Sequence, residues 1–384
     1  MVEPKIQGEA APGFEKVREA FKANWEGYEV GACFSVVYQG KTVIDLWGGY
    51  KDREMTTPWE KETLVNVYST TKGMGSLALA VLADEGRLDY EALVVDYWPE
   101  FGAEGKQDVT VAQLISHQAG LCGLSERLTA EDLYDWDKMV GLLAAQKPHW
   151  EPCTEVGYHA VTWGFLAGEL IRRITGKTLG TYFREKVAEP LGANFYIGLP
   201  DSEMDRVVYM IGPNRARVPQ KKSGGPPPKA PPMYAITQQN PVIRPFQDVG
   251  SHAWRKAELA AANGHANARS IARVYGALAN GGEIDGVRII SQKGIEAATK
   301  EEVSGRTDLV TGMVPVFARG FALNMDKNMG PNPKSFGHAG AGGSLGFADP
   351  DANIGFGYAM NQMQVNTDDE SRAGRLVQAA YDCL

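Results

Sequence analysis

Ser69 and Lys72 have the spacing that a nucleophilic serine and its proton partner need. They open the run Ser69-Thr70-Thr71-Lys72, and residues three apart share one face of a helix. We predict a helix over residues 69–85. Ser69 would occupy its first turn, where unpaired backbone N–H groups and the helix dipole favour negative charge. The adjacent amine lowers the cost of deprotonating a hydroxyl.

The tetrapeptide by itself fits a capping serine and a solvated lysine better than a catalytic pair, so its surroundings matter. An extended apolar run, 65–68, leads into Ser69, and Gly73 and Gly75 follow Lys72. Each glycine costs a helix about 1 kcal/mol. A helix that accepts small residues there lets another backbone or a ligand approach closely, which favours the catalytic interpretation.

Tyr158 is the second candidate for chemistry. It lies in Gly157-Tyr158-His159-Ala160, in a predicted loop before a helix over 161–176. An ammonium group beside a phenol lowers the phenol's pKa, which lets it act as a general base. The chain has 15 tyrosines, and a core or surface role is the alternative for any one of them.

The third candidate is the glycine-dense segment 337–343, which contains His338, Gly340 and Ala341. Glycine lets backbone lie against a ligand. The N–H of Ala341, together with that of Ser69, would then form an oxyanion hole. A glycine-rich turn between two strands explains the segment equally well.

Ser344 also matches a nucleophile motif, G-x-S-x-G, in residues 342–346. That motif requires a strand, a sharp turn and then a helix. Here the residues that follow, 347–350, lead into a turn and another strand. We therefore do not expect Ser344 to be the nucleophile.

Composition excludes several classes of function. The 384-residue chain has a formal charge of −8 and no block of basic residues, which argues against a nucleic-acid partner. No apolar window reaches the 18 or so residues of a membrane span, and the N-terminal residues lack the apolar core of a signal peptide. We expect a cytoplasmic protein that acts on a small molecule; its oligomeric state is left open.

Cysteine and histidine give no sign of a metal or cofactor site. Four widely spaced cysteines form no CxxC pair, and we expect free, mostly buried thiols. The six histidines form neither an H-E-x-x-H motif nor a His/Cys cluster. We interpret His117 as a hydrogen-bonded structural residue. No metal and no cofactor is expected.

Periodicity places the predicted elements at both ends and in the middle of the chain. Helices are expected at 15–25, 109–116, 130–145, 161–176, 257–281 and 367–381, the last opened by a capping box at 367–370. Strands are expected at 31–38, 42–49, 320–325, 344–348 and 354–360. The proline-rich residues 211–248 form an irregular segment, which either lines a binding site or is a surface insertion. Two strands from the start and about three from the end would form one sheet.

Taken together, these motifs resemble the serine β-lactamase and penicillin-binding-protein family, most of all class C β-lactamases and the family VIII carboxylesterases. Ser69-Thr70-Thr71-Lys72, Tyr158-His159-Ala160 and His338-Ala339-Gly340 follow in the family's order. Further similar segments are 114–121, 262–269 and Gly281-Gly282. The resemblance spans roughly residues 10 to 382.

The resemblance implies an α/β fold of the α+β type. An antiparallel sheet flanked by helices would come from residues 1–85 and 255–384, and a mainly helical domain from 86–254. It also implies that Ser69 is the nucleophile, Lys72 its proton partner and Tyr158 a base and then an acid, with the N–H groups of Ser69 and Ala341 as the oxyanion hole.

Three positions depart from the lactamase pattern. Ala160 replaces the Asn of Y-x-N, and His338 and Ala339 replace the Lys and Thr of K-T-G. The lost side chains are contacts for a substrate amide and carboxylate, and H-x-G is similar to the esterase branch. We therefore expect hydrolysis of short-chain carboxylic esters.

Other activities remain open at this stage. A β-lactamase, a D-peptide hydrolase or another amide hydrolase or acyltransferase would use the same mechanism, and an inactive binding homologue would keep only the fold. His338, Gly340 and Trp254 are the candidate substrate-binding residues, and Phe246 is a further candidate for an acyl pocket.

Overall fold

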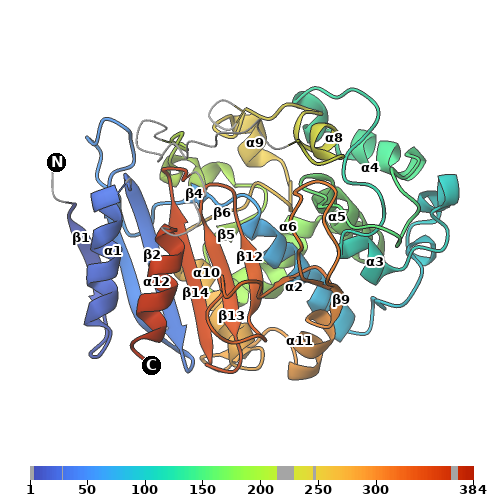
Figure 1. Ribbon diagram of the computed structural model, residues 1–384. Helices are drawn as coiled ribbons and strands as arrows, with labels where there is room; N and C mark the ends of the chain where they lie inside the picture. Colours follow the sequence, from blue (N-terminus) through green and yellow to red (C-terminus); the bar gives the residue numbers. More distant parts are fainter. Residues whose placement is uncertain (1–3, 28, 214–228, 245–247, 365–370) are drawn as a thin grey trace.

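The fold is built on a nine-stranded antiparallel sheet (Figure 1). The computed structural model describes residues 4–27, 29–213, 229–244, 248–364 and 371–384. The strand order is β1-β3-β2-β14-β13-β12-β11-β10-β9. The strands are β1 (Ile6–Ala10), β2 (Gly31–Tyr38), β3 (Lys41–Gly49), β9 (Glu301–Val303), β10 (Phe317–Ala318), β11 (Ala322–Leu323), β12 (Phe336–Ala339), β13 (Leu345–Asp349) and β14 (Ile354–Met360).

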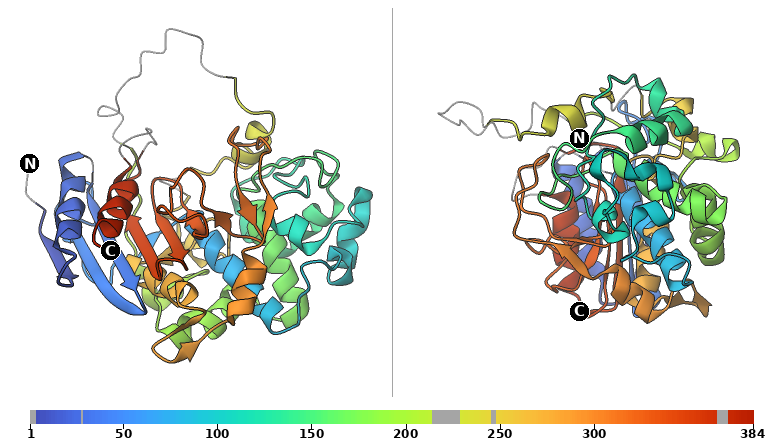
Figure 2. Two further views of the ribbon diagram at one scale, coloured as in Figure 1. Left: turned by 60° about the horizontal axis from the view of Figure 1, so that its bottom comes forward. Right: turned by 90° about the vertical axis from the view of Figure 1, so that its right-hand side faces the viewer.

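The two ends of the chain meet in the middle of this sheet. Strand β2 pairs antiparallel with β14, from Ala32 opposite Met360 to Tyr38 opposite Ile354. Every residue of β14 is buried, because helices cover both faces. Helices α1 (Glu15–Gly27) and α12 (Arg372–Tyr381) pack together on one face, and α10 (Ala268–Ala279) packs on the other (Figures 1 and 2).

The remaining helices and short strands lie between β3 and β9 in sequence and are coloured from blue through green to orange in Figure 1. A second sheet, in the order β4-β6-β5, joins three distant segments. These elements are β4 (Val65–Asn66), α2 (Thr70–Asp84), α3 (Val111–Ile115), α4 (Trp136–Ala145), α5 (Thr162–Thr175), α6 (Leu179–Phe183), α7 (Glu189–Leu191), β5 (Phe195–Tyr196), α8 (Tyr234–Gln238), α9 (His252–Lys256), β6 (His265–Ala266), β7 (Glu283–Ile284), β8 (Val287–Arg288) and α11 (Gln292–Ala298).

The predicted α/β fold with an antiparallel sheet made by both chain ends is confirmed. The hairpin 31–49 and the helices near 69–85 and 161–176 are confirmed to within a few residues. The sheet is larger than predicted, since β1, β9, β10 and β12 were not expected. The division into residues 1–85 with 255–384 and 86–254 stays a proposal.

The predicted helix over 257–281 is wrong in its first half. The helix α10 begins only at Ala268, with Asn267 as its N-cap. The side chain of Asn263 explains this, because it accepts from Leu259 N–H and donates to the carbonyls of Trp254 and Ala257. These bonds hold the preceding residues in a loop, since an asparagine side chain competes with helical backbone bonds.

Two other predictions fall partly outside the described residues. Of the proline-rich segment 211–248, residues 214–228 and 245–247 lie outside them, and the described remainder contains the short helix α8. The predicted capping box at 367–370 also lies outside the described residues. Helix α12 is capped instead by Ser371, whose hydroxyl accepts from Gly374 N–H.

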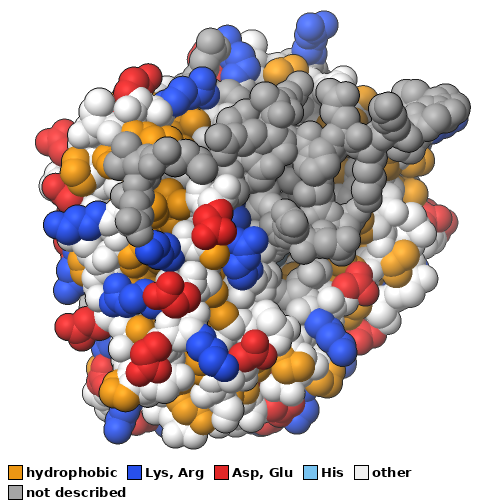
Figure 3. Space-filling view, turned by 60° about the vertical axis from the view of Figure 1, so that its left-hand side comes forward, with side chains coloured by type: hydrophobic (Ala, Val, Ile, Leu, Met, Phe, Trp, Pro, Cys, Tyr) orange, Lys and Arg blue, Asp and Glu red, His pale blue; other side chains and the backbone are white. Residues whose placement is uncertain are grey.

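The surface agrees with the absence of a basic block from the sequence. On the face in Figure 3, acidic and basic side chains are interspersed among small apolar areas, and neither sign forms a large patch. Among the described helices, none is both long and apolar enough to cross a bilayer. The four cysteines are free thiols, and Cys33 and Cys122 are buried.

Close contact between α10 and the sheet depends on glycine. A Cβ built on Gly355 would lie 2.1 Å from the backbone nitrogen of Gly276. We expect Gly355→Ala to lower the free energy of unfolding by about 1–3 kcal/mol, because the overpacked interface must shift. Chemical denaturation measures the change. Gly141→Ala in α4 is the control: its Cβ would meet nothing within 4 Å, so it should be neutral or stabilising, and equal losses in both variants would contradict the explanation.

Candidate active site

Ser69 stands at the junction between strand β4 and helix α2. It is the N-cap residue of α2, and its side chain is half-buried. The chain turns sharply just before it, because Tyr68 has a φ of +46°, a conformation that costs a non-glycine residue of order 1–3 kcal/mol. Thr71 holds this turn: its hydroxyl donates to Tyr68 O at 2.5 Å and accepts from Gly264 N–H at 2.8 Å. The fold therefore presents the Ser69 hydroxyl at the start of the helix, as predicted.

Lys72 is fully buried one turn further along α2. Its Nζ donates to the carbonyl oxygens of Ala160 at 2.8 Å and Ala261 at 2.9 Å, and lies 3.3 Å from Ser69 Oγ. Burial holds the pKa of Lys72 well below its ordinary value, because desolvation disfavours the charged form. A neutral amine has two N–H groups and one lone pair. With both N–H groups on carbonyls, the lone pair is left for the Ser69 hydroxyl.

Tyr158 is the third member of the group and lies beside Lys72. Lys72 Nζ lies 4.7 Å from the centre of its ring, which also stacks on Phe317 at 6.3 Å. Burial raises the pKa of Tyr158, and its hydrogen bond with Ser69 opposes this shift only in part. The expected lowering of the phenol's pKa by an ammonium is therefore not found, because Lys72 is itself desolvated. The structure does bring Ser69, Lys72 and Tyr158 together.

His338, on strand β12, is the next residue around the site. Its ring centre is 6.0 Å from that of Tyr158. Its Nδ1 lies 2.6 Å from Ala339 O, and since a carbonyl can only accept, Nδ1 carries the proton. Nε2 is buried and has no hydrogen-bond partner among the described residues. Burial is the main cause that lowers the pKa of His338 to about 3, so its Nε2 is a neutral acceptor.

The glycine-dense turn after β12 packs directly against the start of α2. A Cβ on Gly340 would lie 2.2 Å from Val67 O, which explains the need for glycine there. The N–H of Gly340 donates to Ser344 O and the N–H of Gly343 to Gly340 O. In the described part of the chain, the N–H groups of Ser69 and Ala341 donate to no other residue. They are available for a ligand.

Ser344 is part of the support rather than of the cluster. Its buried hydroxyl donates to Val67 O at 2.8 Å and lies 3.0 Å from Thr70 Oγ1. Strand β13 follows it, so the strand–turn–helix context of a nucleophile elbow is missing.

Trp254, a candidate substrate-binding residue, contacts Asn66 of strand β4. Its indole is buried, and Nε1 donates to Asn66 Oδ1 at 3.0 Å. Phe246, the other candidate for an acyl pocket, lies outside the described residues.

Two neighbours of Tyr158 were not expected from the sequence. The His117 ring lies 5.0 Å from that of Tyr158 and 4.6 Å from that of Phe317. His117 Nδ1 also accepts from His159 N–H at 3.0 Å, which fixes the loop that carries Tyr158. His117 therefore has the hydrogen-bonded structural role that was expected, and it lies beside the candidate site. Phe317 lies in β10, a strand of two residues that is too short for a periodic signal.

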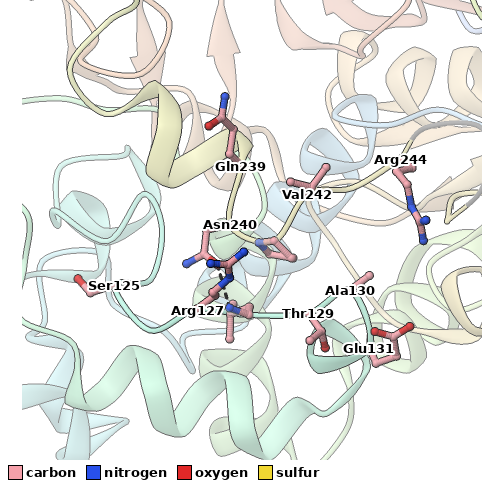
Figure 4. A pocket seen from close by; sticks show the side chains of 11 residues that line it. Ser125, Arg127, Thr129, Ala130, Glu131, Gln239, Asn240, Val242 and Arg244 are labelled. Carbon is pink, nitrogen blue, oxygen red and sulfur yellow. Dashed lines mark hydrogen bonds between the residues drawn. The ribbon is translucent and has the colours of Figure 1, made fainter.

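A separate hollow lies on the surface of the helical part of the molecule. It is a groove of about 680 Å³ lined by residues from 125–131 and 239–244, among them Arg127, Glu131 and Arg244 (Figure 4). Ser69, Lys72 and Tyr158 are not among its lining residues. The groove is therefore distinct from the cluster.

Comparisons with known proteins agree with this geometry. The β-lactamase family model matches residues 17–381. A solved family VIII carboxylesterase is 51% identical with a TM-score of 0.92, covering 99% of this chain and 100% of that one. A penicillin-binding protein homologue from Caulobacter crescentus is 41% identical with a TM-score of 0.91 over 99% and 100%.

A relative found by sequence comparison supports the same family. LipL of Mycobacterium tuberculosis strain H37Rv, described as an esterase/β-lactamase, is 36% identical over 374 residues, 94% of this chain and 83% of LipL. The chain belongs to the β-lactamase family, which confirms the resemblance drawn from the sequence motifs. Its fold is the β-lactamase/transpeptidase type.

The buried amine of Lys72 should make stability depend on pH. The unfolded chain binds a proton at Lys72 that the folded protein does not, so stability rises with pH between the lowered folded pKa and about 10.4. We expect Lys72→Met to reduce this slope by about 1.4 kcal/mol per pH unit, measured by denaturant unfolding from pH 7 to 10. Lys293→Met, at an exposed site, should keep the parent slope. An unchanged slope in Lys72→Met would mean that Lys72 is charged in the folded protein.

Proposed function

We propose that this protein is a serine carboxylesterase that hydrolyses short-chain esters through an acyl-enzyme on Ser69. The observation that carries the proposal is the Lys72 amine. It is buried, has two carbonyl acceptors for its N–H groups and lies 3.3 Å from Ser69 Oγ. A neutral amine in that position can take the hydroxyl proton as the oxygen attacks.

In the proposed acylation step, the Ser69 proton moves to Lys72 Nζ while Oγ bonds to the ester carbonyl carbon. The N–H groups of Ser69 and Ala341 hold the resulting oxyanion. When the tetrahedral intermediate collapses, the bond to the alcohol oxygen breaks and the Tyr158 hydroxyl protonates that oxygen. The Lys72 ammonium then returns its proton to Tyr158, which restores both neutral groups.

Deacylation repeats these steps with water. Lys72 accepts a proton from the water, the water oxygen attacks the acyl carbon, and Tyr158 protonates Ser69 Oγ as the acid leaves. The Lys72 ammonium then returns its proton to Tyr158, which regenerates the enzyme. Tyr158 acts first as an acid in this scheme. The raised pKa of its phenol supports that order over an initial tyrosinate base, because burial disfavours the charged phenolate.

His338 supports an ester over an anionic amide as the substrate. Its Nε2 is a buried neutral acceptor beside Tyr158. Such an atom repels a substrate carboxylate, which a lysine at this position would attract. One relative, the solved family VIII carboxylesterase, supports the same substrate class, whereas LipL is described as an esterase/β-lactamase and is compatible with both classes.

The identity of the nucleophile can be tested with paired serine variants. We expect Ser69→Ala to lower kcat/KM for 4-nitrophenyl butyrate by at least about 10³-fold, because removing the nucleophile leaves only binding and the oxyanion hole. Ser344→Ala should retain most activity, with a loss confined to stability. The reverse pattern would assign the chemistry to Ser344.

Trapping the intermediate gives an independent check on the same prediction. A fluorophosphonate probe should add one equivalent of mass, and peptide mapping should place it on Ser69. The protein would be an inactive homologue if the folded parent remained unlabelled and hydrolysed none of a panel of short-chain esters.

The preference for neutral esters can be tested at position 338. We expect His338→Lys to raise the ratio of kcat/KM for a chromogenic cephalosporin to that for 4-nitrophenyl butyrate by about tenfold or more, since a charge-assisted hydrogen bond contributes ~1.5–3 kcal/mol. His252→Lys, at an exposed site, controls for added charge. Parent enzyme that already turns over the cephalosporin much faster than the ester would contradict the proposed substrate class.

A further inference from the structure

Arg255, on helix α9, is a buried cation without a counter-charge. Its residue exposure is 8%, and its Nε and Nη2 atoms have no hydrogen-bond partner. Within the described ranges, no carboxylate forms an ion pair with it. The nearby acidic groups are engaged elsewhere. Glu258, which follows α9, accepts from the Thr178 hydroxyl and from Gly180 N–H, Asp248 pairs with Arg244, and Asp201 pairs with His252 and Lys256 of α9 itself.

Two further side chains complete this feature, which we call the Arg255 cluster: Arg255, His265 and Tyr209. The guanidinium carbon of Arg255 lies 4.9 Å from the centre of the Tyr209 ring, which is largely exposed. His265, on β6, is fully buried, and neither of its ring nitrogens has a partner in the part of the chain that the structure describes. Burial and the charge of Arg255 lower the pKa of His265 to about 3, so it is neutral and keeps one N–H donor.

Unpaired buried donors of this kind are rare and costly. Desolvating a charged group costs several kcal/mol unless an opposite charge and hydrogen bonds compensate, and buried polar atoms nearly always have a partner. Tyr209 stabilises the cation through its ring and its hydroxyl, but Nε and Nη2 of Arg255 are left without an acceptor among the described residues. A water molecule would accept these hydrogen bonds and leave the charge uncompensated.

We propose that the Arg255 cluster binds a small inorganic anion. A halide or an oxyanion such as phosphate supplies both things that are missing, a negative charge and acceptors for the N–H groups of Arg255 and His265. Both kinds of anion are small and carry concentrated negative charge. Melting and diffraction in bromide and in phosphate distinguish between them.

The anion would lie behind the catalytic cluster. His265 pairs with Asn66 in the short sheet that leads to Ser69, and Asn66 accepts from the indole of Trp254, the neighbour of Arg255. Asn263 ties Trp254 O into the same loop that offers Ala261 O to Lys72. A bound anion therefore braces the segment 254–265, which supplies one of the two acceptors of the Lys72 amine.

Salt-specific stabilisation tests the proposal. The parent protein is melted in sodium bromide, sodium phosphate and sodium gluconate at equal ionic strength, because gluconate is too bulky for a buried site. We expect a saturable rise in Tm of about 2 °C or more in bromide, phosphate or both, relative to gluconate. Arg255→Gln should abolish the difference, while Arg244→Gln, at an exposed arginine, should retain it.

Diffraction from the parent protein provides a test that no variant can confound. Crystals grown in sodium bromide should show an anomalous peak within about 3.5 Å of Arg255 Nε or Nη2. If only phosphate raises the Tm, crystals grown in sodium phosphate should instead show tetrahedral density at that position. Equal melting in all three salts, or water as the occupant in crystals from both bromide and phosphate, would overturn the proposal.

Discussion

The burial of one amine is the constraint on which the site depends. Lys72 is removed from water on a helix whose fold gives it two carbonyl acceptors, from Ala160 and Ala261. Desolvation lowers the pKa of the amine and so favours its uncharged form, in which the two acceptors direct the lone pair toward Ser69. If either carbonyl moved, Nζ would be free to rotate away from Oγ. The catalytic assignment therefore depends as much on these two backbone oxygens as on the side chains.

Those two carbonyls come from segments that are far apart in sequence and held by different means. His117 fixes the loop around Tyr158 and Ala160 through the backbone of His159. Asn263 fixes the loop around Ala261 through three backbone bonds. Both anchors are buried polar side chains with specific partners. Such partners specify one arrangement, because any other leaves buried groups unpaired.

The sheet places the remaining groups of the candidate site around the amine. Since β2 and β14 pair in the middle of the sheet, strand β12 lies beside α2 and brings His338 opposite Tyr158. Gly340 allows the following turn to contact the backbone before Ser69. Ser344, which resembles a nucleophile in sequence, instead joins this turn to Val67 and Thr70. A serine with two buried hydrogen bonds holds the wall of the site in place.

The sequence by itself indicated the fold class, because periodicity encodes helices and long strands, and indicated the family through the resemblance of its ordered motifs. It also singled out Ser69, Lys72 and Tyr158, which the structure brings together. It could not supply the start of α10, since Asn263 overrides helix formation through bonds to Trp254 and Ala257. It also gave the wrong direction for the pKa of Tyr158. Only the tertiary structure sets the burial of Lys72 and of that phenol, and burial, rather than residue type, decides which group carries charge.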